Sequence, residues 1–238
     1  METFEGYDVF IQAGQSNAEG FGVGDSLYEY VLDEDILYIS YDKIFSVAKR
    51  GIMNNFSLSF CARYKAEGLL KENRKLLIVR AAVGSSGFSD GRWSMDGDLY
   101  NKMKDVLHFV FKQEGKHVLK GVLWHQGEHD VHYKATYEQH KNNLLTMIRD
   151  IRLQYGKDVY FIGADFVHEW RMTTPACQEV RRAMQDVFSM HNNAFVNTDY
   201  LNSNHEEGLN DESIHFSAKA QDILGEKYFN AYAKLIGR

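Results

Sequence analysis

The sequence predicts an α/β fold, a three-layer α/β/α sandwich around a parallel sheet of about five strands. Short apolar runs rich in Val, Ile, Leu and Phe alternate with longer segments of helical periodicity. The runs show little polar alternation, which is typical of strands buried on both faces. Strands separated by helices of this length imply βαβ units, wound on both faces of one sheet.

Each element follows from its local pattern. The longest helix has a capping box, Thr136 with Gln139, before its apolar stripe, and Gly156 stops it. The predicted strands are Asp8–Gln12, Leu76–Val83, Val118–Trp124, Val159–Ala164 and Ala194–Val196, and the predicted helices run from about Phe56 to Leu70, Leu99 to Glu114, Tyr137 to Tyr155 and Ser217 to Ile236.

Composition excludes several classes of protein. The chain has 238 residues, of which 44% are hydrophobic and 13% aromatic, so intrinsic disorder is excluded. Its single proline, Pro175, and the lack of any linker or repeat predict one domain over residues 1–238. Two cysteines, Cys61 and Cys177, are too few for a disulfide framework and are interpreted as reduced, buried thiols.

Net charge and hydropathy limit the kinds of partner that this chain can have. The net charge is −6, with the basic residues scattered, which argues against binding to nucleic acid. No apolar run reaches the roughly 18 residues of a membrane span, so no membrane partner is expected. The N-terminus has no hydrophobic signal region, which predicts a cytoplasmic protein or a secreted one already trimmed of its signal. The oligomeric state stays open.

Three polar, glycine-bearing segments follow the first three predicted strands, at residues 13–20, 83–88 and 125–128. In such sheets ligands bind outside the carboxyl ends of the strands. Ser16 in the first segment is the candidate nucleophile, since Gly14 permits a sharp turn before it; its alternative role is a helix N-cap.

A serine nucleophile needs a histidine base, and the base needs an acid to fix its tautomer. Glu212 stands three residues before His215, just ahead of the last helix. Asp165 and His168 have the same spacing after the fourth predicted strand and compete for the role.

Gly14-Gln15-Ser16-Asn17, Gly84, the Trp124–Glu128 block and an acid before His215-Phe216 occur in this order across positions 14 to 216. Together they resemble the SGNH-hydrolase superfamily, most closely its sialate O-acetylesterase and carbohydrate esterase family 6 (acetylxylan esterase) branch. The resemblance implies a flavodoxin-like α/β/α fold and hydrolysis of acetyl esters on carbohydrates, with no metal and no cofactor.

The resemblance also implies roles for single residues. Ser16 would be the nucleophile and His215 the base. The backbone N–H groups of Ser16 and Gly84 and the side-chain amide of Gln126 would form the oxyanion hole, which agrees with the need for fixed donors at the developing charge. Asn17 would support the site.

The triad acid departs from the family pattern. The family usually has aspartate three residues before the histidine, where this chain has Glu212, with Asp211 one place earlier. We take Glu212 as the acid, with Asp211 next and Glu128 third. Outside that role, Asp211 would support the site and Glu128 would anchor its loop.

A rival pattern overlaps the third segment. Residues 125–129 match H-x-x-E-H, the inverted zinc-peptidase motif, with His132 as a further candidate ligand. That motif needs a continuous helix, whereas a strand runs into it here and Gly127 is a poor helix residue. We therefore place His129 and His132 at the mouth of the site.

Other residues have open roles. Arg80, Arg92 and Trp93 suit the rim of a sugar site, and the alternative role of Trp93 is to pack over its loop. The segments Tyr28–Arg50 and His168–Trp170 have no assigned role.

The sequence thus predicts a serine hydrolase that removes acetyl groups from a small-molecule or oligosaccharide ester through an acyl-enzyme. The alternatives are a broad short-chain carboxylesterase and a non-catalytic carbohydrate-binding relative.

Overall fold

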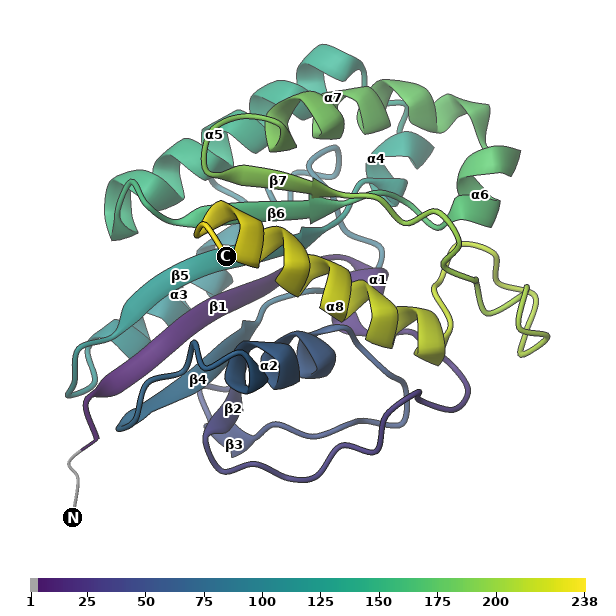
Figure 1. Ribbon diagram of the computed structural model, residues 1–238. Coiled ribbons are helices and arrows are strands. Elements are labelled where there is room, and N and C mark those ends of the chain that lie inside the picture. Colours follow the sequence, from purple (N-terminus) through teal and green to yellow (C-terminus); the bar gives the residue numbers. More distant parts are fainter. Residues whose placement is uncertain (1–3) are drawn as a thin grey trace.

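The computed structural model describes residues 4–238, which form a seven-stranded sheet flanked by helices on both faces (Figure 1). The strand order is β3-β2-β4-β1-β5-β6-β7, and every neighbouring pair is parallel except β2 with β3. The strands are β1 (Gly6–Gly14), β2 (Ile36–Ile39), β3 (Ser46–Val47), β4 (Arg74–Arg80), β5 (Val118–His125), β6 (Tyr160–Ala164) and β7 (Asn193–Val196).

Five of these strands confirm the sequence prediction, but the predicted number of about five was too low. The two missed strands, β2 and β3, lie in the Tyr28–Arg50 segment that had no assigned role. β2 has four residues, and β3 has two and pairs antiparallel at the sheet edge. β2 is the apolar run Ile36–Ile39, a signal that could have found it, whereas β3 has two residues and only tertiary pairing marks it as a strand.

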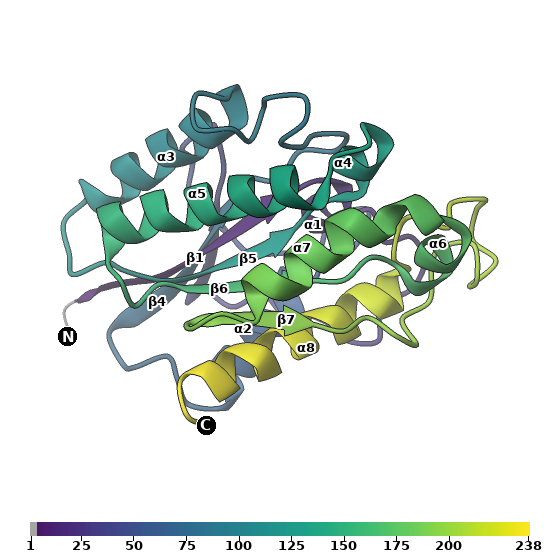
Figure 2. The same ribbon diagram turned by 90° about the horizontal axis from the view of Figure 1, so that it is seen from above.

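Helices cover the two faces of the sheet in two groups, which Figure 2 shows from above. One face packs against α3, α5 and α7, and the other against α2 and α8. The helices are α1 (Ser16–Glu19), α2 (Ser57–Ala66), α3 (Asp98–Phe111), α4 (Glu128–His132), α5 (Tyr137–Tyr155), α6 (His168–Thr173), η1 (Pro175–Cys177), α7 (Gln178–Phe188) and α8 (Ala218–Leu235).

The four predicted helices are confirmed as α2, α3, α5 and α8, with ends that differ by a few residues. In α5 both hydrogen bonds of the predicted capping box form between Thr136 and Gln139. Sequence reasoning missed α7, although its buried residues, Val180, Met184 and Val187, recur at helical spacing. That spacing was the signal that could have found it.

Two hydrophobic cores lie on opposite faces of the sheet because central strands point alternate side chains to each face. In β1, Val9 and Ile11 belong to the core under α3, α5 and α7, whereas Phe10 belongs to the core under α2 and α8. In the strand order β1 is the central strand, so its carboxyl end lies between those of β4 and β5.

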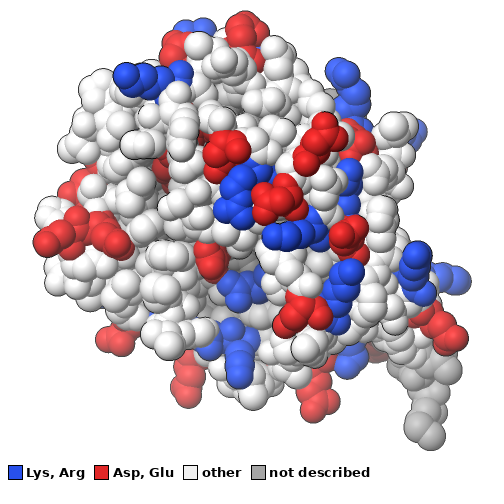
Figure 3. Space-filling model, turned by 180° about the vertical axis from the view of Figure 1, so that it is seen from behind, with Lys and Arg blue, Asp and Glu red and all other residues white. Residues whose placement is uncertain are grey.

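Cys61 and Cys177 are free, buried thiols, as predicted. No helix within residues 4–238 is both long and apolar enough to cross a lipid bilayer. On the face that Figure 3 shows, basic and acidic side chains are intermixed.

Candidate active site

The ends of β1, β4 and β5 bring the three polar segments to one edge of the sheet. Gln12 pairs with Arg80 of β4, and Gly14 pairs with His125 of β5, so the loops that follow these strands start side by side. In Figure 1 the short helix α1 lies at this edge, close to α4 and to the start of α8.

The turn from β1 into α1 presents Ser16. Gly14 has φ 129°, and a side chain there would place its Cβ 2.0 Å from the carbonyl oxygen of His125. The next residue, Gln15, donates its N–H to that same carbonyl at 2.9 Å, and its side-chain Oε1 accepts the N–H of His129 at 3.0 Å. Glycine is thus required where the chain turns, and Gln15 ties the turn to the β5–α4 loop.

Ser16, His215 and Glu212 form one hydrogen-bonded chain. The Ser16 Oγ lies 2.9 Å from His215 Nε2, and His215 Nδ1 lies 2.9 Å from Glu212 Oε2. Ser16 is buried, whereas the Glu212 side chain is 49% exposed. The hydrogen bond to His215 lowers the pKa of Glu212, which is therefore ionised at neutral pH.

Asn17 joins the turn that carries Ser16 to the histidine segment, residues 214–216 around His215. Its Nδ2 donates to the carbonyl of Ile214 at 2.9 Å, and its Oδ1 accepts the N–H of Phe216 at 3.1 Å. The two bonds hold the backbone on both sides of His215. The same Nδ2 also donates to Glu128 Oε1 at 2.9 Å.

Glu128 is buried behind Asn17, and within residues 4–238 its carboxylate makes no hydrogen bond to the His215 side chain. Burial raises the pKa of Glu128 to about 7 and lowers the pKa of the neighbouring His125 to about 3. His125 is therefore neutral, and its Nε2 lies 3.8 Å from Glu128 Oε1. Glu128 supports the loop through Asn17 in this geometry.

Gly84 lies beside the nucleophile. A Cβ on Gly84 would be 3.8 Å from the Cβ of Ser16 and 3.7 Å from the ring of Phe21. That ring in turn lies 5.1 Å from the His215 ring, between centroids. The N–H of Gly84 donates to Glu19 Oε2 at 2.7 Å, a contact that no pattern in the sequence predicts.

Gln126 is fully buried, and its amide nitrogen donates to Asp130 Oδ2 at 2.9 Å, with the Ser86 carbonyl at 3.5 Å. Burial would raise the pKa of Asp130, but hydrogen bonds from His140 and Ser89 outweigh it and lower that pKa to about 2. Sequence reasoning missed this buried carboxylate, which holds both Gln126 and the second loop.

Several predicted neighbours do not meet. Asp211 is exposed and makes no hydrogen bond to His215 among the described residues. Asp165 binds Arg181, at 2.8 Å from its Nε, and does not contact His168, whose Nδ1 lies 3.2 Å from Asp199.

Of the two roles left open for Trp93, the structure shows packing at the loop and not the rim of a sugar site. Trp93 is 1% exposed and donates to Ser86 Oγ at 2.9 Å, so it packs under the second loop. Arg92 pairs with Asp98 at 3.1 Å.

The residues of the rival zinc motif sit on two elements. His125 ends strand β5 and is 1% exposed, whereas His129 lies in helix α4 and pairs with Asp90 at 3.1 Å. The continuous helix that the motif requires is therefore missing between them. Within residues 4–238 no group of three or more side chains has the arrangement of a metal site.

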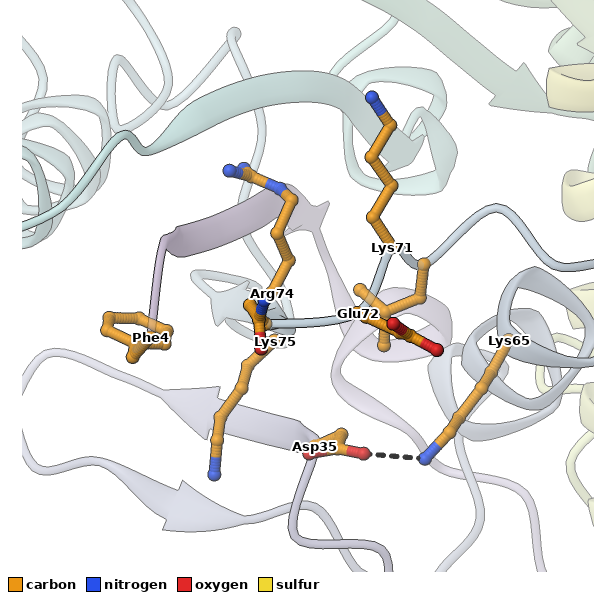
Figure 4. Close-up of a pocket in the computed structure, with 9 residues that line it drawn as sticks. Phe4, Asp35, Lys65, Lys71, Glu72, Arg74 and Lys75 are labelled. Atoms are coloured by element: carbon orange, nitrogen blue, oxygen red, sulfur yellow. Dashed lines mark hydrogen bonds and ion pairs between the residues drawn. The ribbon is translucent and has the colours of Figure 1, made fainter. Parts of the chain in front are cut away.

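The larger hollows of the molecule lie away from Ser16. One of about 380 Å³ opens near the amino end of β4, lined by Phe4, Asp35, Lys65 and residues 70–75. Figure 4 shows these side chains, with the ion pair between Lys65 and Asp35 at 2.8 Å. No serine or histidine lines it, so its size does not make it a reactive site.

A family model described as "Carbohydrate esterase, sialic acid-specific acetylesterase" matches residues 6–234. The chain belongs to this family. It is therefore a carboxylic ester hydrolase, a carbohydrate O-acetylesterase, and the resemblance to SGNH sialate O-acetylesterases is confirmed. No curated protein sequence matches the chain.

Solved structures share the fold of this esterase. NanS has a TM-score of 0.82 at 18% identity, over 99% of each chain. A protein from Arabidopsis thaliana has a TM-score of 0.78 at 22% identity, over 95% of this chain and 98% of that one. A carbohydrate acetylesterase from Xanthomonas citri has a TM-score of 0.63 at 15% identity, over 96% of this chain and 56% of that one.

Proposed function

We propose that this esterase removes acetyl groups from carbohydrates through a Ser16–His215–Glu212 triad and an acyl-enzyme. The observation that carries the proposal is the hydrogen-bonded chain of these three side chains, 2.9 Å at each link. An ionised carboxylate can only accept, so Glu212 favours the tautomer with the proton on Nδ1. Nε2 is then free to accept the proton of Ser16.

In the first step Ser16 Oγ attacks the acetyl carbonyl while His215 takes its proton. The imidazolium then protonates the leaving sugar oxygen, and the acetyl group stays on Ser16. A water molecule, deprotonated by the same histidine, hydrolyses this acyl-enzyme and releases acetate. The Glu212 carboxylate stabilises the imidazolium in both halves of the cycle.

Backbone donors would meet the oxyanion. Ser16 is the first residue of α1, so its N–H has no acceptor within the helix. Gly84 adds a second N–H next to Ser16. Gln126 would add a third donor by giving up its long hydrogen bond to the Ser86 carbonyl, at 3.5 Å. Each such donor is worth about 10²- to 10³-fold in rate in a well-studied protease.

The substrate class follows from the family, whose description names a sialic acid-specific acetylesterase. We propose an O-acetylated sugar, a monosaccharide or an oligosaccharide, as the substrate of this chain. A panel of acetylated sugars that includes an O-acetylated sialic acid tests this directly.

Ser16→Ala should abolish turnover of every acetyl ester, because loss of a triad nucleophile removes several orders of magnitude of rate. Ser189→Ala, on a serine at the end of α7, is the matched control and should keep full activity. An organophosphate should add one covalent group to the wild-type protein and none to Ser16→Ala, as read by intact mass. Retention of about a tenth of the activity in Ser16→Ala would overturn the proposal.

A further inference from the structure

Glu19 is the last residue of α1, three positions after the proposed nucleophile. Its Oε2 accepts the N–H of Gly84 at 2.7 Å. We propose that Glu19 gates the oxyanion hole: its carboxylate caps the Gly84 N–H in the resting enzyme and leaves when a substrate carbonyl binds. This gate rests on the proposed roles of Ser16 and Gly84.

The Glu19 carboxylate occupies the Gly84 N–H in the way that the oxyanion of a substrate would. A negatively charged oxygen at 2.7 Å from an N–H has the charge and the distance that an oxyanion takes toward its donor. A Cβ built on Gly84 would meet this same oxygen at 3.3 Å and the Ser16 Cβ at 3.8 Å. The carboxylate and the nucleophile therefore lie on the same side of Gly84, and an ester carbonyl bound there competes with Glu19.

The structure offers a place for the displaced carboxylate. Glu19 and Arg80 both line a polar hollow of about 180 Å³ beside α1. Arg80 donates to the main-chain carbonyl of Glu19 at 2.6 Å, and its guanidinium lies 5.1 Å from the centroid of the Tyr38 ring. Among the described residues no carboxylate lies within 4.0 Å of Arg80, so this cation is available for a bidentate pair.

The gate therefore has two positions, one on the Gly84 N–H and one on Arg80. Every substrate must move the Glu19 carboxylate from the Gly84 N–H to Arg80. The free energy of this move lowers kcat/KM by the same factor for all substrates. That property separates a gate from a contact with the sugar, because a contact would affect only substrates that carry the sugar.

Removal of the carboxylate tests the gate. Glu19→Ala should raise kcat/KM roughly three- to tenfold, which is the range of a charge-assisted hydrogen bond after discount for partial exposure. The rise should be equal for p-nitrophenyl acetate and for an acetylated sugar, and organophosphate labelling of Ser16 should speed up alike. Glu19→Gln should give a smaller rise, since a neutral amide oxygen is a weaker acceptor. Glu114 is an exposed residue between α3 and β5, so Glu114→Ala is the control and should leave kcat/KM unchanged.

Arg80→Met sharpens the test because it removes the second position. In the wild-type background it should lower kcat/KM roughly two- to fivefold, and in the Glu19→Ala background it should have no effect. An equal loss in both backgrounds, or a fall in activity in both Glu19→Ala and Glu19→Gln, would mean that Glu19 and Arg80 only hold the loops, and would overturn the gate. A rise confined to the acetylated sugar would overturn it too. Activity in Ser16→Ala would instead refute the proposed function itself.

Discussion

The two walls of the site are built in different ways. On the nucleophile side, Gln15, Asn17 and Glu128 are buried. Gln15 accepts the N–H of His129, and Asn17 donates to Glu128, so the loops after β1 and β5 are joined. On the histidine side, Glu212 is half exposed, and its side chain is held by hydrogen bonds to His215 and Asn210. The fold itself thus fixes Ser16, whereas the base and its acid depend on a surface segment that Asn17 attaches to the buried wall.

This difference bears on the departure at the triad acid. In a buried wall one extra methylene costs about 1–3 kcal/mol through overpacking. The side chain of Glu212 extends into solvent, so the longer acid can reach His215 Nδ1 at 2.9 Å with no neighbour displaced. The exposed wall is therefore the one in which glutamate can replace the usual aspartate.

Among the variants that compare the two walls, the largest effect is expected at Glu212. Glu212→Gln keeps the shape but removes the negative charge that holds the imidazole tautomer, and should lower kcat/KM by roughly 10²- to 10³-fold. The loss is set below the 10⁴-fold of a buried triad because water can reach the exposed carboxylate. Kinetics on one acetyl ester measure it.

Asp211→Asn is the matched control, one residue away and without a hydrogen bond to His215. It should cost tenfold or less. If Asp211→Asn is the more damaging variant, the role of the acid passes to Asp211. Near-wild-type rates in both variants would pass it to Glu128 or leave a Ser–His dyad.

Asn17 tests whether the two walls are joined. Asn17→Ala removes three hydrogen bonds of a buried side chain, two of which hold the backbone of Ile214 and Phe216 on either side of His215. We expect a roughly 10- to 100-fold fall in kcat/KM and about 2–3 kcal/mol less free energy of unfolding. Urea denaturation and steady-state kinetics measure the two effects.

Asn17→Asp refines this test. An aspartate still accepts from the Phe216 N–H, but its carboxylate faces Glu128 and the Ile214 carbonyl, where only a donor is satisfied. It should be at least as damaging as alanine. Wild-type kinetics in Asn17→Ala would show that each wall holds its own position.

The fold was predictable where a pattern is local. Apolar runs mark β1, β4, β5, β6 and β7, and helical periodicity with caps marks α5. The edge strand β3 is set by its pairing with β2, which leaves no trace in two residues, whereas β2 has an apolar run that sequence reasoning passed over.

The candidate site shows the same limit. The order of the motifs singled out Ser16 and His215, although they are 199 positions apart in the chain and only the folded structure brings them together. Contacts that depend on where a side chain points were not predictable. The Glu19 carboxylate on Gly84 and the Asp130 carboxylate on Gln126 are of this kind.

The smallest effect is expected at Glu128, on the stability of the buried wall. Burial raises the pKa of its carboxyl from 4.5 to about 7, so between these values the folded protein holds a proton that the unfolded chain has released. Stability is then lost as the pH rises from about 4.5 to about 7. Glu128→Gln has no proton to lose and keeps the oxygen that accepts from Asn17.

The free energy of unfolding of Glu128→Gln, relative to wild type, should therefore rise by about 1–3 kcal/mol between pH 4.5 and 7 and stay level above pH 8. The full shift from 4.5 to about 7, at about 1.4 kcal/mol for each pH unit, corresponds to about 3.5 kcal/mol, and the part that falls between pH 4.5 and 7 is somewhat smaller. Urea denaturation at four pH values measures it, with Glu114→Gln as the exposed control that should show no such slope. A difference that falls as the pH rises would mean that Glu128 is ionised in the folded protein. In that case the buried wall, like the exposed one, would place a charged carboxylate within reach of the histidine segment.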